Sequence, residues 1–376
     1  MDPNQAQALL GGLSPAQFMH RHWHKQPLWV REAVPRVVSP VTRAEMFALA
    51  ARDDVESRLI RCDEGHRWHL RHGPLPRRAL PALAQAGWTL LVQGLDLHVD
   101  AAHELLARFR FVPAARLDDL MLSYASDGGG VGPHVDSYDV FLLQVQGRRR
   151  WRIARVEQPT LRDDVPLKML ARFVPEQEAL LEPGDMLYLP PGWAHEGVAV
   201  GGDCLTASIG FRAPRADELA QALLARLADG AGEDKAGLRY RDAGQPATTS
   251  PGAVPESLQR FARRAVTSAL RDPSALERTL GEWLTEPKPQ VWFDASRVAQ
   301  NAHGGVRLDR RTRMAYDARH IFINGESLRA AGRDARLVRM LADRRRLDAA
   351  SMHRASAQAQ ALLAEWLGNG WLHALD

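Results

Sequence analysis

The sequence contains very little cysteine, with Cys62 and Cys204 as the two thiols among 376 residues. Two cysteines so far apart do not make a disulfide framework, which argues against a small secreted scaffold. The start, MDPNQAQALLGGLSP, lacks a basic stretch followed by a long apolar run, and no apolar run in the chain approaches membrane-spanning length. We therefore expect a protein of the reducing cytoplasm that makes no membrane contact.

Internal repeats and low-complexity tracts are also lacking, so none competes with a division into separate domains. The composition is that of an ordinary soluble protein, 45% hydrophobic and 25% charged, and the length predicts two or three domains. There are 49 basic and 45 acidic residues, and the pI is near 9.3. This small basic excess fits a protein that meets nucleic acid or an RNA-bound partner, but it is weak evidence alone.

The most informative stretch is GGGVGPHVDSYDVFLLQVQGRRRW (128–151), an apolar, strand-like run that carries His134 and Asp136. In a strand, residues i and i+2 point to the same face, so both side chains can reach one metal ion. A third ligand is available in His195, which follows a Pro-Pro-Gly turn. Two histidines and one aspartate form a facial triad, which leaves open positions and suits non-haem Fe(II). A His-x-Asp pair by itself is common by chance.

The run of arginines after this pair strengthens the metal hypothesis. Arg149 lies fifteen residues beyond His134 and is flanked by Arg148 and Arg150. A basic run usually decorates a solvated face, but alternation on a strand turns the middle arginine opposite to its neighbours. Arg149 could then point into the fold and bind a carboxylate through two hydrogen bonds.

These motifs and their surroundings resemble one known family. RLDDLMLSYA (116–125), GGGVGPHVDSYDVF (128–141) and PPGWAH (190–195) are similar to the bacterial JmjC-type ribosomal oxygenases of the YcfD type, which hydroxylate an arginine of the 50S ribosomal protein L-sixteen. The resemblance runs from FMHRHWHKQPLWVREA (18–33) to HIFINGESL (320–328). The metal motif is common to all 2-oxoglutarate-dependent JmjC enzymes, whereas the flanking phrases are more specific.

The resemblance implies an iron enzyme that uses 2-oxoglutarate as cosubstrate and O2. His134, Asp136 and His195 would hold Fe(II). Arg149, where most JmjC relatives have lysine, would bind the distal carboxylate of 2-oxoglutarate with Ser123 as its hydroxyl partner. The resemblance also implies a homodimer formed through a helical segment.

The chain before Pro214 predicts a barrel with a helical leader, which we assign to a JmjC catalytic domain at 1–214. Ser14 and Pro15 predict the start of one helix, and TRAEMFALAAR (42–52) predicts another. His20, His22 and His24 tempt a metal interpretation, which we reject because their spacing scatters them around a helix. Short apolar runs separated by turn residues between 111 and 212 predict a cupin-like jelly roll, the double-stranded β-helix.

After Pro214 the apolar spacing becomes helical. ADELAQALLARLAD (216–229) and SLQRFARRAVTSAL (257–270) predict two helices joined by the flexible AGQPATTSPGAVP (243–255), and we assign 215–286 to dimerisation. RMAYDARHIFINGES (313–327) predicts two short strands around a turn, between helices, so 287–376 is interpreted as a winged-helix-like domain. Its 15 basic and 9 acidic residues permit nucleic-acid binding, but we favour contact with protein.

An arginine substrate brings a cation to a partly dry pocket, so a carboxylate besides Asp136 should line it. By strand parity Asp119 faces the barrel with Ser123, whereas Asp118 points away. Tyr138 would flank the aliphatic stem of the substrate, and Ser208 would be a further acceptor. An almost equally good alternative is that Asp119 pairs with a structural arginine such as Arg116.

Three functions compete on the sequence alone. The first is a 2-oxoglutarate-dependent hydroxylase of a ribosomal protein, with arginine preferred and histidine as the alternative. The second is a cupin-type oxygenase of small molecules. The third is a non-enzymatic winged-helix regulator that binds nucleic acid. The intact triad and Arg149 favour the first.

Overall fold

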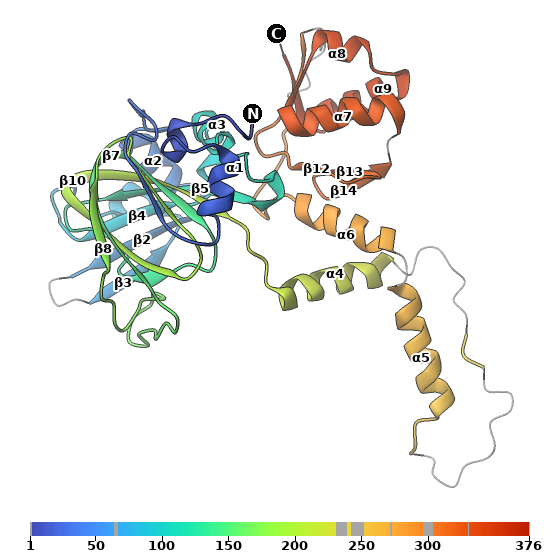
Figure 1. The fold of residues 1–376 in the computed structure, drawn as a ribbon, viewed down its shortest axis with the longest axis horizontal. Helices are drawn as coiled ribbons and strands as arrows, with labels where there is room; N and C mark the ends of the chain where they lie inside the picture. Colours follow the sequence, from blue (N-terminus) through green and yellow to red (C-terminus); the bar gives the residue numbers. More distant parts are fainter. Residues whose placement is uncertain are drawn as a thin grey trace. The chain divides into compact units, whose positions relative to one another are not determined.

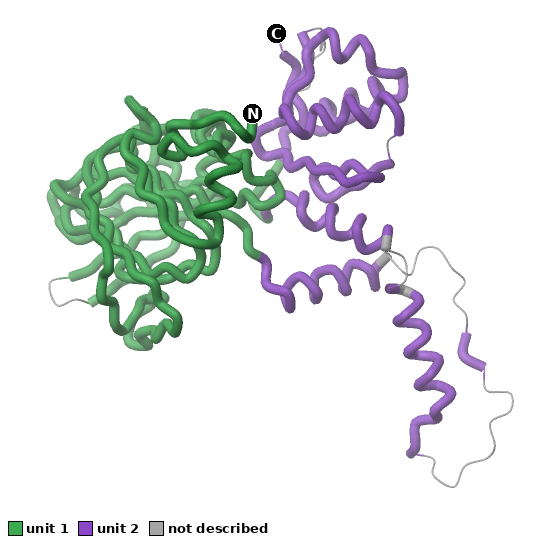
Figure 2. The backbone as a smooth tube through the Cα atoms, in the orientation of Figure 1, with its two compact units in different colours: residues 1–213, 289–292 green, residues 214–288, 293–376 purple. Residues whose placement is uncertain are grey.

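The computed structural model describes residues 2–63, 67–230, 239–241, 252–270, 273–295, 304–329 and 331–375. The chain divides into two compact units, one of residues 1–213 with 289–292 and the other of residues 214–288 with 293–376 (Figure 2). Residues 243–251 of the expected flexible connection lie outside the described residues. In the part of the chain that is described, no helix is both long and apolar enough to span a membrane.

The first unit begins with a helical leader whose caps agree with the sequence. Ser14 Oγ accepts a hydrogen bond from the Gln17 amide, and the Gln17 side chain accepts one from the Ser14 amide, so this capping box and Pro15 fix the helix start as predicted. The predicted second helix is confirmed, capped by Thr42 and Glu45. The leader elements are η1 (Ala8–Leu10), α1 (Pro15–Arg21), β1 (Leu28–Val30), α2 (Arg43–Ala50), β2 (Ser57–Cys62), β3 (Trp68–His72), η2 (Arg77–Ala79), β4 (Trp88–Val92), η3 (Leu95–Leu97), α3 (Asp100–Ala107) and η4 (Ala114–Arg116).

The expectation that His20, His22 and His24 are spread around one helix is wrong. Helix α1 ends at Arg21 and does not carry the last two. His24 adopts a left-handed backbone with φ 57°, and its Nε2 lies 3.3 Å from Asp139 Oδ2. His22 Nδ1 hydrogen-bonds to the Pro27 carbonyl. His22 and His24 therefore link the segment after α1 to Pro27 and to Asp139.

The barrel is an antiparallel jelly roll, as predicted (Figure 1). Its strands follow the order β1-β9-β7-β10-β5-β4-β2-β3, with β6 paired to β10 and β8 paired to β7. The remaining strands are β5 (Leu117–Ala125), β6 (His134–Val135), β7 (Val140–Arg155), β8 (Gln177–Leu181), β9 (Met186–Leu189) and β10 (Trp193–Phe211).

Two long strands depart from the expectation of short, separate runs. VFLLQV and RWRIARV belong to one strand, β7, because Gly147 bends the chain at φ 65° without a loop. An alanine Cβ at 147 would lie 2.9 Å from the Asp203 carbonyl, so this close approach requires glycine. The partner strand β10 has its own irregularity opposite, between Val200 and Leu205. Strands β7 and β10 therefore remain paired on both sides of this irregularity.

Burial along β7 explains how the strand can present a charge to the interior. Its first six residues are all buried, since Phe141 and Leu143 pack in the main core with the leader while Val140 and Leu142 face the barrel. Beyond Gly147 the burial alternates because one face alone is covered. The main core includes an aromatic group in which the Phe18 and Tyr188 ring centroids are 4.8 Å apart.

The second unit holds the helices after Pro214 and the winged-helix fold, both as predicted in kind. Its elements are α4 (Ala216–Gly230), α5 (Glu256–Ala269), α6 (Pro273–Thr285), β11 (Gly305–Leu308), β12 (Met314–Tyr316), β13 (His320–Ile323), β14 (Glu326–Arg329), α7 (Gly332–Arg344), β15 (Arg346–Asp348), α8 (Ala349–His353), α9 (Ala357–Gly368) and β16 (Leu372–Ala374). These strands form the sheets β12-β13-β14 and β15-β11-β16.

The sequence predicted β12 and β13 of this unit but not α6, β14 or the second sheet of β11, β15 and β16. Helix α6 packs on β12, β13 and β14, with Gly281 lying directly against the ring of Phe322. Strand β14 follows a tight turn at Asn324 and Gly325, whose φ angles are 48° and 90°. An Asn-Gly pair between apolar runs is a strong hairpin signal, so β14 could have been predicted.

Candidate metal centre and cosubstrate cavity

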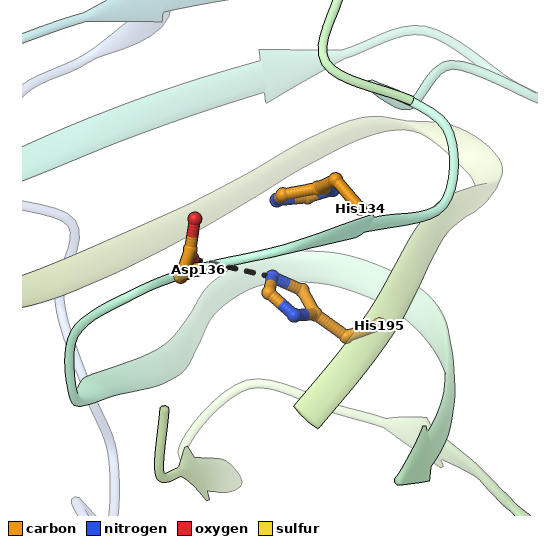
Figure 3. A group of neighbouring side chains, drawn as sticks. All are labelled: His134, Asp136 and His195. Atoms are coloured by element: carbon orange, nitrogen blue, oxygen red, sulfur yellow. Dashed lines mark ion pairs between the residues drawn. The ribbon is translucent and has the colours of Figure 1, made fainter. Parts of the chain in front are cut away.

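Strand pairing brings the three predicted ligands together (Figure 3). His134 on β6 is the direct antiparallel partner of His195 on β10, and their ring centroids are 4.1 Å apart. Asp136 follows two residues after His134, and its Oδ2 lies 3.6 Å from His195 Nε2. One ligand atom from each residue can be chosen so that all lie within 4.8 Å of one another, a spacing at which one ion could bind all three.

Backbone carbonyls fix which imidazole nitrogen faces the centre. His134 Nδ1 lies 2.9 Å from the Gly132 carbonyl, and His195 Nδ1 lies 3.2 Å from the Trp193 carbonyl. A carbonyl oxygen can only accept, so each Nδ1 carries the proton and donates. Each Nε2 then keeps its lone pair for a metal, the usual arrangement of metal-ligating histidines.

The environment keeps His195 neutral. The residue is 2% exposed, and burial, together with the nearby His134, lowers the pKa of His195 to about 4 against the opposing effect of Asp136. Metal binding requires neutral imidazole, so no proton has to be displaced from this residue near pH 7. The Asp136 side chain is 21% exposed and supplies the anionic ligand atom.

Arg149 points inward, as the alternation predicted. It is 4% exposed, whereas Arg148 and Arg150 on either side are exposed. Among the described residues, its Nε and Nη2 have no hydrogen-bond partner. Its guanidinium lies 5.6 Å from the ring centroid of Trp151. Because unpaired buried donors are costly, this planar fork is suited to a carboxylate supplied by a ligand.

One cavity of about 480 Å³ connects these groups. It is lined by the three predicted ligands, by Arg149, and by the predicted substrate residues Asp119, Tyr138 and Ser208. Ser123 is buried but is not part of the described lining, and its hydroxyl donates to the Thr206 carbonyl at 3.3 Å. Sequence reasoning missed Trp151, although its i+2 spacing from Arg149 puts it on the same strand face.

One of the two neighbouring aspartates departs from strand parity. Asp119 Oδ2 accepts hydrogen bonds from Gln93 Nε2 at 2.7 Å and from the Gly94 amide at 2.9 Å, and the residue is 3% exposed. The expectation that Asp118 points away is wrong, since Asp118 also lines the cavity.

A register shift explains this departure. Gly210 pairs with Asp119 but Phe211 pairs with Leu117, so Asp118 is the extra residue of a bulge. Its carboxylate lies 3.5 Å from Arg212 Nε. Arg116, the alternative partner considered for Asp119, has its Nη2 3.8 Å from Asp139 Oδ2.

The fold and the site together define a class, the JmjC-type oxygenases, in which a double-stranded β-helix holds a facial triad beside a buried basic residue. A JmjC domain model matches residues 104–219, and a ROXA-like winged helix model matches residues 268–373.

Known proteins give the family within that class. The ribosomal protein uL16 3-hydroxylase of Escherichia coli (strain K12) is 33% identical over 278 residues, which are 73% of this chain and 72% of that protein. A probable ribosomal oxygenase of Haemophilus influenzae is 35% identical over 211 residues, 55% of this chain and 52% of that protein. The X-ray structure of E. coli YcfD matches with a TM-score of 0.81 at 29% identity, covering 95% of this chain and 97% of that one.

A structure of YcfD in complex with cobalt and 2-oxoglutarate matches with a TM-score of 0.78 at 28% identity, covering 96% and 98% of the two chains. The chain belongs to the JmjC-type ribosomal oxygenases, which are 2-oxoglutarate-dependent dioxygenases.

Proposed function

We propose that this chain is an Fe(II)- and 2-oxoglutarate-dependent hydroxylase that acts on an arginine side chain of a 50S ribosomal protein. His134, Asp136 and His195 would hold the iron, and Arg149 would bind the distal carboxylate of 2-oxoglutarate. The observation that carries this proposal is the buried guanidinium of Arg149, whose Nε and Nη2 lack partners in the described chain while it shares a cavity with the three ligands.

The residues present fit both groups. Two imidazole Nε2 atoms and one carboxylate oxygen form the donor set that Fe(II) enzymes of this class use. When bound, iron supplies the redox chemistry that couples O2 and 2-oxoglutarate to hydroxylation of a C–H, with succinate and carbon dioxide as the other products. Arg149 orients the cosubstrate, and the cavity walls hold the substrate C–H at the open side of the triad.

The cosubstrate role of Ser123 remains a prediction. Its hydroxyl is engaged with the Thr206 carbonyl but keeps its acceptor lone pairs, and rotation would allow it to donate to a carboxylate instead. Thr206 Oγ1 on the neighbouring strand donates to Gln144 Oε1 at 2.9 Å.

An arginine substrate is favoured by the negative groups that line the cavity. Asp118, Asp119 and Asp136 all line it, and partial burial together with these three carboxylates raises the pKa of Tyr138. Burial is the larger cause and disfavours a charge of either sign, but the contribution of the carboxylates would favour a cation here. Tyr138 is 38% exposed and can lie along the aliphatic part of an arginine, with Ser208 as a further acceptor.

The oligomeric state proposed is a homodimer formed through residues 215–286. In that segment Leu224 is 51% exposed, Val266 is 61% exposed and Leu276 is 44% exposed, so the helices carry apolar surface that a second copy would bury. Light scattering of the intact chain tests this, and a monomer mass over a wide concentration range would exclude the dimer. For the winged helix we propose contact with protein rather than nucleic acid. We also propose a cytoplasmic location, because the proposed substrate is a ribosomal protein.

Mass spectrometry of ribosomal proteins from cells with and without this enzyme tests the function. We expect one added oxygen on an arginine, together with enzyme-dependent conversion of 2-oxoglutarate to succinate in vitro. An added oxygen on a histidine would support the histidyl hydroxylase instead. Turnover of 2-oxoglutarate with a small molecule but with no ribosomal protein would support the cupin-type alternative.

A further inference from the structure

The loop between β7 and β8, residues 156–176, packs against the segment that immediately precedes the first histidine of the triad. Met169 is 3% exposed, and its methyl end occupies the place where a Cβ on Gly132 would lie. The Leu170 amide donates to the Pro133 carbonyl at 2.8 Å. Gly132 itself has φ 76°, a conformation that other residues rarely adopt. Two consecutive loop residues therefore hold two consecutive residues of the Gly132–His134 segment.

The peptide unit held by this contact is the one that orients the imidazole. The Gly132 carbonyl accepts the Nδ1–H of His134 at 2.9 Å, which directs Nε2 toward Asp136 and His195. Outer hydrogen bonds of this kind fix the tautomer and ring direction of metal-bound histidines. A rotation of the Gly132 peptide would remove the acceptor.

The loop is built to keep its own shape. The Arg162 amide donates to the Met169 carbonyl, and the Ala171 amide donates to the Thr160 carbonyl, each at 2.8 Å. Leu161 and Leu170 form an isolated antiparallel bridge. Residues 160–171 therefore form a hairpin with Met169 and Leu170 on its returning arm. The tip of this hairpin, Pro166 to Lys168, lines the same cavity as the triad.

We infer that Met169 is a positioning residue for His134 and acts through the Gly132 peptide. The inference rests on the proposed function in that His134 is taken as a metal ligand. It predicts a defect in the metal-free protein, because the contact from Met169 to the Gly132 peptide and on to His134 Nδ1 runs through protein atoms alone.

The first test reads the tautomer of His134 in the metal-free, full-length protein by long-range ¹H–¹⁵N correlation, with His134→Gln to assign the signal. In the wild type we expect the Nδ1–H form. Met169→Ala should lose this preference, and Met169→Leu, which fills similar volume, should restore it. Val174→Ala serves as the control because Val174 lies in the same loop and is 62% exposed. An unchanged His134 tautomer in Met169→Ala would overturn the inference.

The second test measures Co²⁺ affinity of the same proteins by the absorption of the bound ion. Loss of an outer contact to a ligand costs about 10–100-fold in metal affinity, so an indirect one should cost about tenfold in Met169→Ala and less than about twofold in Met169→Leu. Gly132→Ala attacks the contact from the other side and should weaken binding at least as much. Equal affinity in all of these proteins would contradict the role of Met169.

The two proposals fail in different ways. Wild-type protein that binds no Co²⁺ would remove the metal assignment, and the tautomer measurement would still decide the role of Met169. Wild-type binding with an unaltered Met169→Ala protein would leave the metal centre in place and remove Met169 from it.

Discussion

The barrel and the winged-helix unit each bury a charged group, but they treat it in opposite ways. In the barrel, Arg149 is 4% exposed, and Nε and Nη2 have no partner among the described residues. In the winged helix, Asp309 is 2% exposed and accepts hydrogen bonds from Arg311 Nε at 2.8 Å, from the Arg311 amide at 2.8 Å and from His373 Nε2 at 2.7 Å. One charge is left for a ligand and the other is used within the fold.

This difference in hydrogen bonding indicates which of the two charges binds a ligand and which stabilises the fold. A buried charge without a partner is costly to the folded state and persists where a ligand supplies the missing acceptor. A buried charge that is fully hydrogen-bonded orders the groups around it and shows no comparable need for a ligand. Removal of Arg149 should therefore affect cosubstrate binding, whereas removal of Asp309 should affect unfolding.

The largest effect is expected at the triad itself. His134→Ala or Asp136→Ala removes one of three protein ligands. The loss of metal affinity should therefore be at least as large as the roughly 100-fold upper limit for loss of a residue that only contacts a ligand. We expect 2-oxoglutarate turnover to fall to background in iron-reconstituted protein while the circular dichroism spectrum is unchanged. His72→Ala, at an exposed histidine of β3, is the matched control. Turnover near the wild-type level in either triad variant would mean that the metal binds elsewhere.

The next effect distinguishes Arg149 from its neighbours. Hydrogen bonds to charged groups contribute about 1.5–3 kcal/mol, so Arg149→Ala should raise the KM for 2-oxoglutarate roughly ten- to a hundredfold. Arg148→Ala and Arg150→Ala should change it less than about threefold, because exposed charges contribute little. Equal effects at all three positions would contradict the inward direction of Arg149 as the basis of cosubstrate binding.

A second substitution of Arg149 should stabilise the protein although it weakens cosubstrate binding. Arg149→Met replaces an unpaired buried charge by an unbranched apolar chain that matches the aliphatic stem of arginine, so the cosubstrate-free protein should gain thermal stability while losing cosubstrate affinity. Lower stability of the Arg149→Met protein would show that the guanidinium is satisfied within the fold.

The alternation of β7 made Arg149 predictable from sequence, and the same is true of the ligand pair His134 and Asp136. Arg149 rests on parity within β7, and the pair rests on its i, i+2 spacing at the end of β6, which Asp136 follows directly; one chain segment determines each pattern by itself. The direction of Asp118 could not be predicted in this way. It depends on a bulge in the pairing of β5 with β10, in which Asp118 is the extra residue, and the residues around Asp118 do not specify that pairing by themselves.

The junction at Gly147 shows a related limit. A glycine between two apolar runs is typical of a turn, and the neighbouring strand decides whether the chain reverses or continues. Here Gly147 bends against Asp203 and Cys204 and continues, so two expected strands are one. By contrast, β14 was missed although the signal, Asn324–Gly325, is local.

In the winged helix we expect Asp309→Ala to lower the free energy of unfolding by about 3 kcal/mol. This is the low end of the range for a broken buried ion pair, because the side chains of Arg311 and His373 are 22% and 23% exposed and keep access to water. Turnover of 2-oxoglutarate should be unchanged. Denaturant unfolding of the full chain measures the loss, with Glu326→Ala, at an exposed site on β14, as the control. A destabilisation no larger than that of Glu326→Ala would contradict the stabilising role.

The pH dependence of this contribution follows from the same hydrogen bonds. Burial alone would raise the pKa of Asp309, but donation from Arg311 and His373 holds it below the ordinary value of 3.8. As pH falls, the unfolded state therefore takes up the proton first, so the stabilisation is complete above about pH 4 and is lost as pH falls through the lower folded pKa. The Asp309→Ala protein should lose this part of the acid dependence.

The smallest effect is expected at Asp118 and Asp119. These two charges line the cavity that binds ligand and are also bound by other groups of the protein. Asp119 is held by Gln93 and Gly94, so its charge is fixed and buried, whereas Asp118 is ion-paired with Arg212 and its side chain is 40% exposed. Asp119→Ala removes a fixed charge and leaves two donors unpaired, which should raise the KM for an arginine peptide of the ribosomal substrate about tenfold. Iron and 2-oxoglutarate binding should be spared. Asp118→Asn should cost about threefold or less, since partly exposed charges are screened.

Normal hydroxylation of that peptide by the Asp119→Ala protein would remove Asp119 from the pocket. Preference of the wild type for a histidine peptide would remove the arginine assignment and leave the oxygenase intact. A larger effect at Asp118 than at Asp119 would mean that the carboxylate nearer to water meets the substrate and that the buried one only positions Gln93. The ratio of the two KM changes therefore tells whether a charge that is already hydrogen-bonded within the fold can also bind a substrate. Arg149 and Asp309 cannot decide this, because the first has donors without partners among the described residues and the second is fully hydrogen-bonded and is not part of the described lining of the cavity.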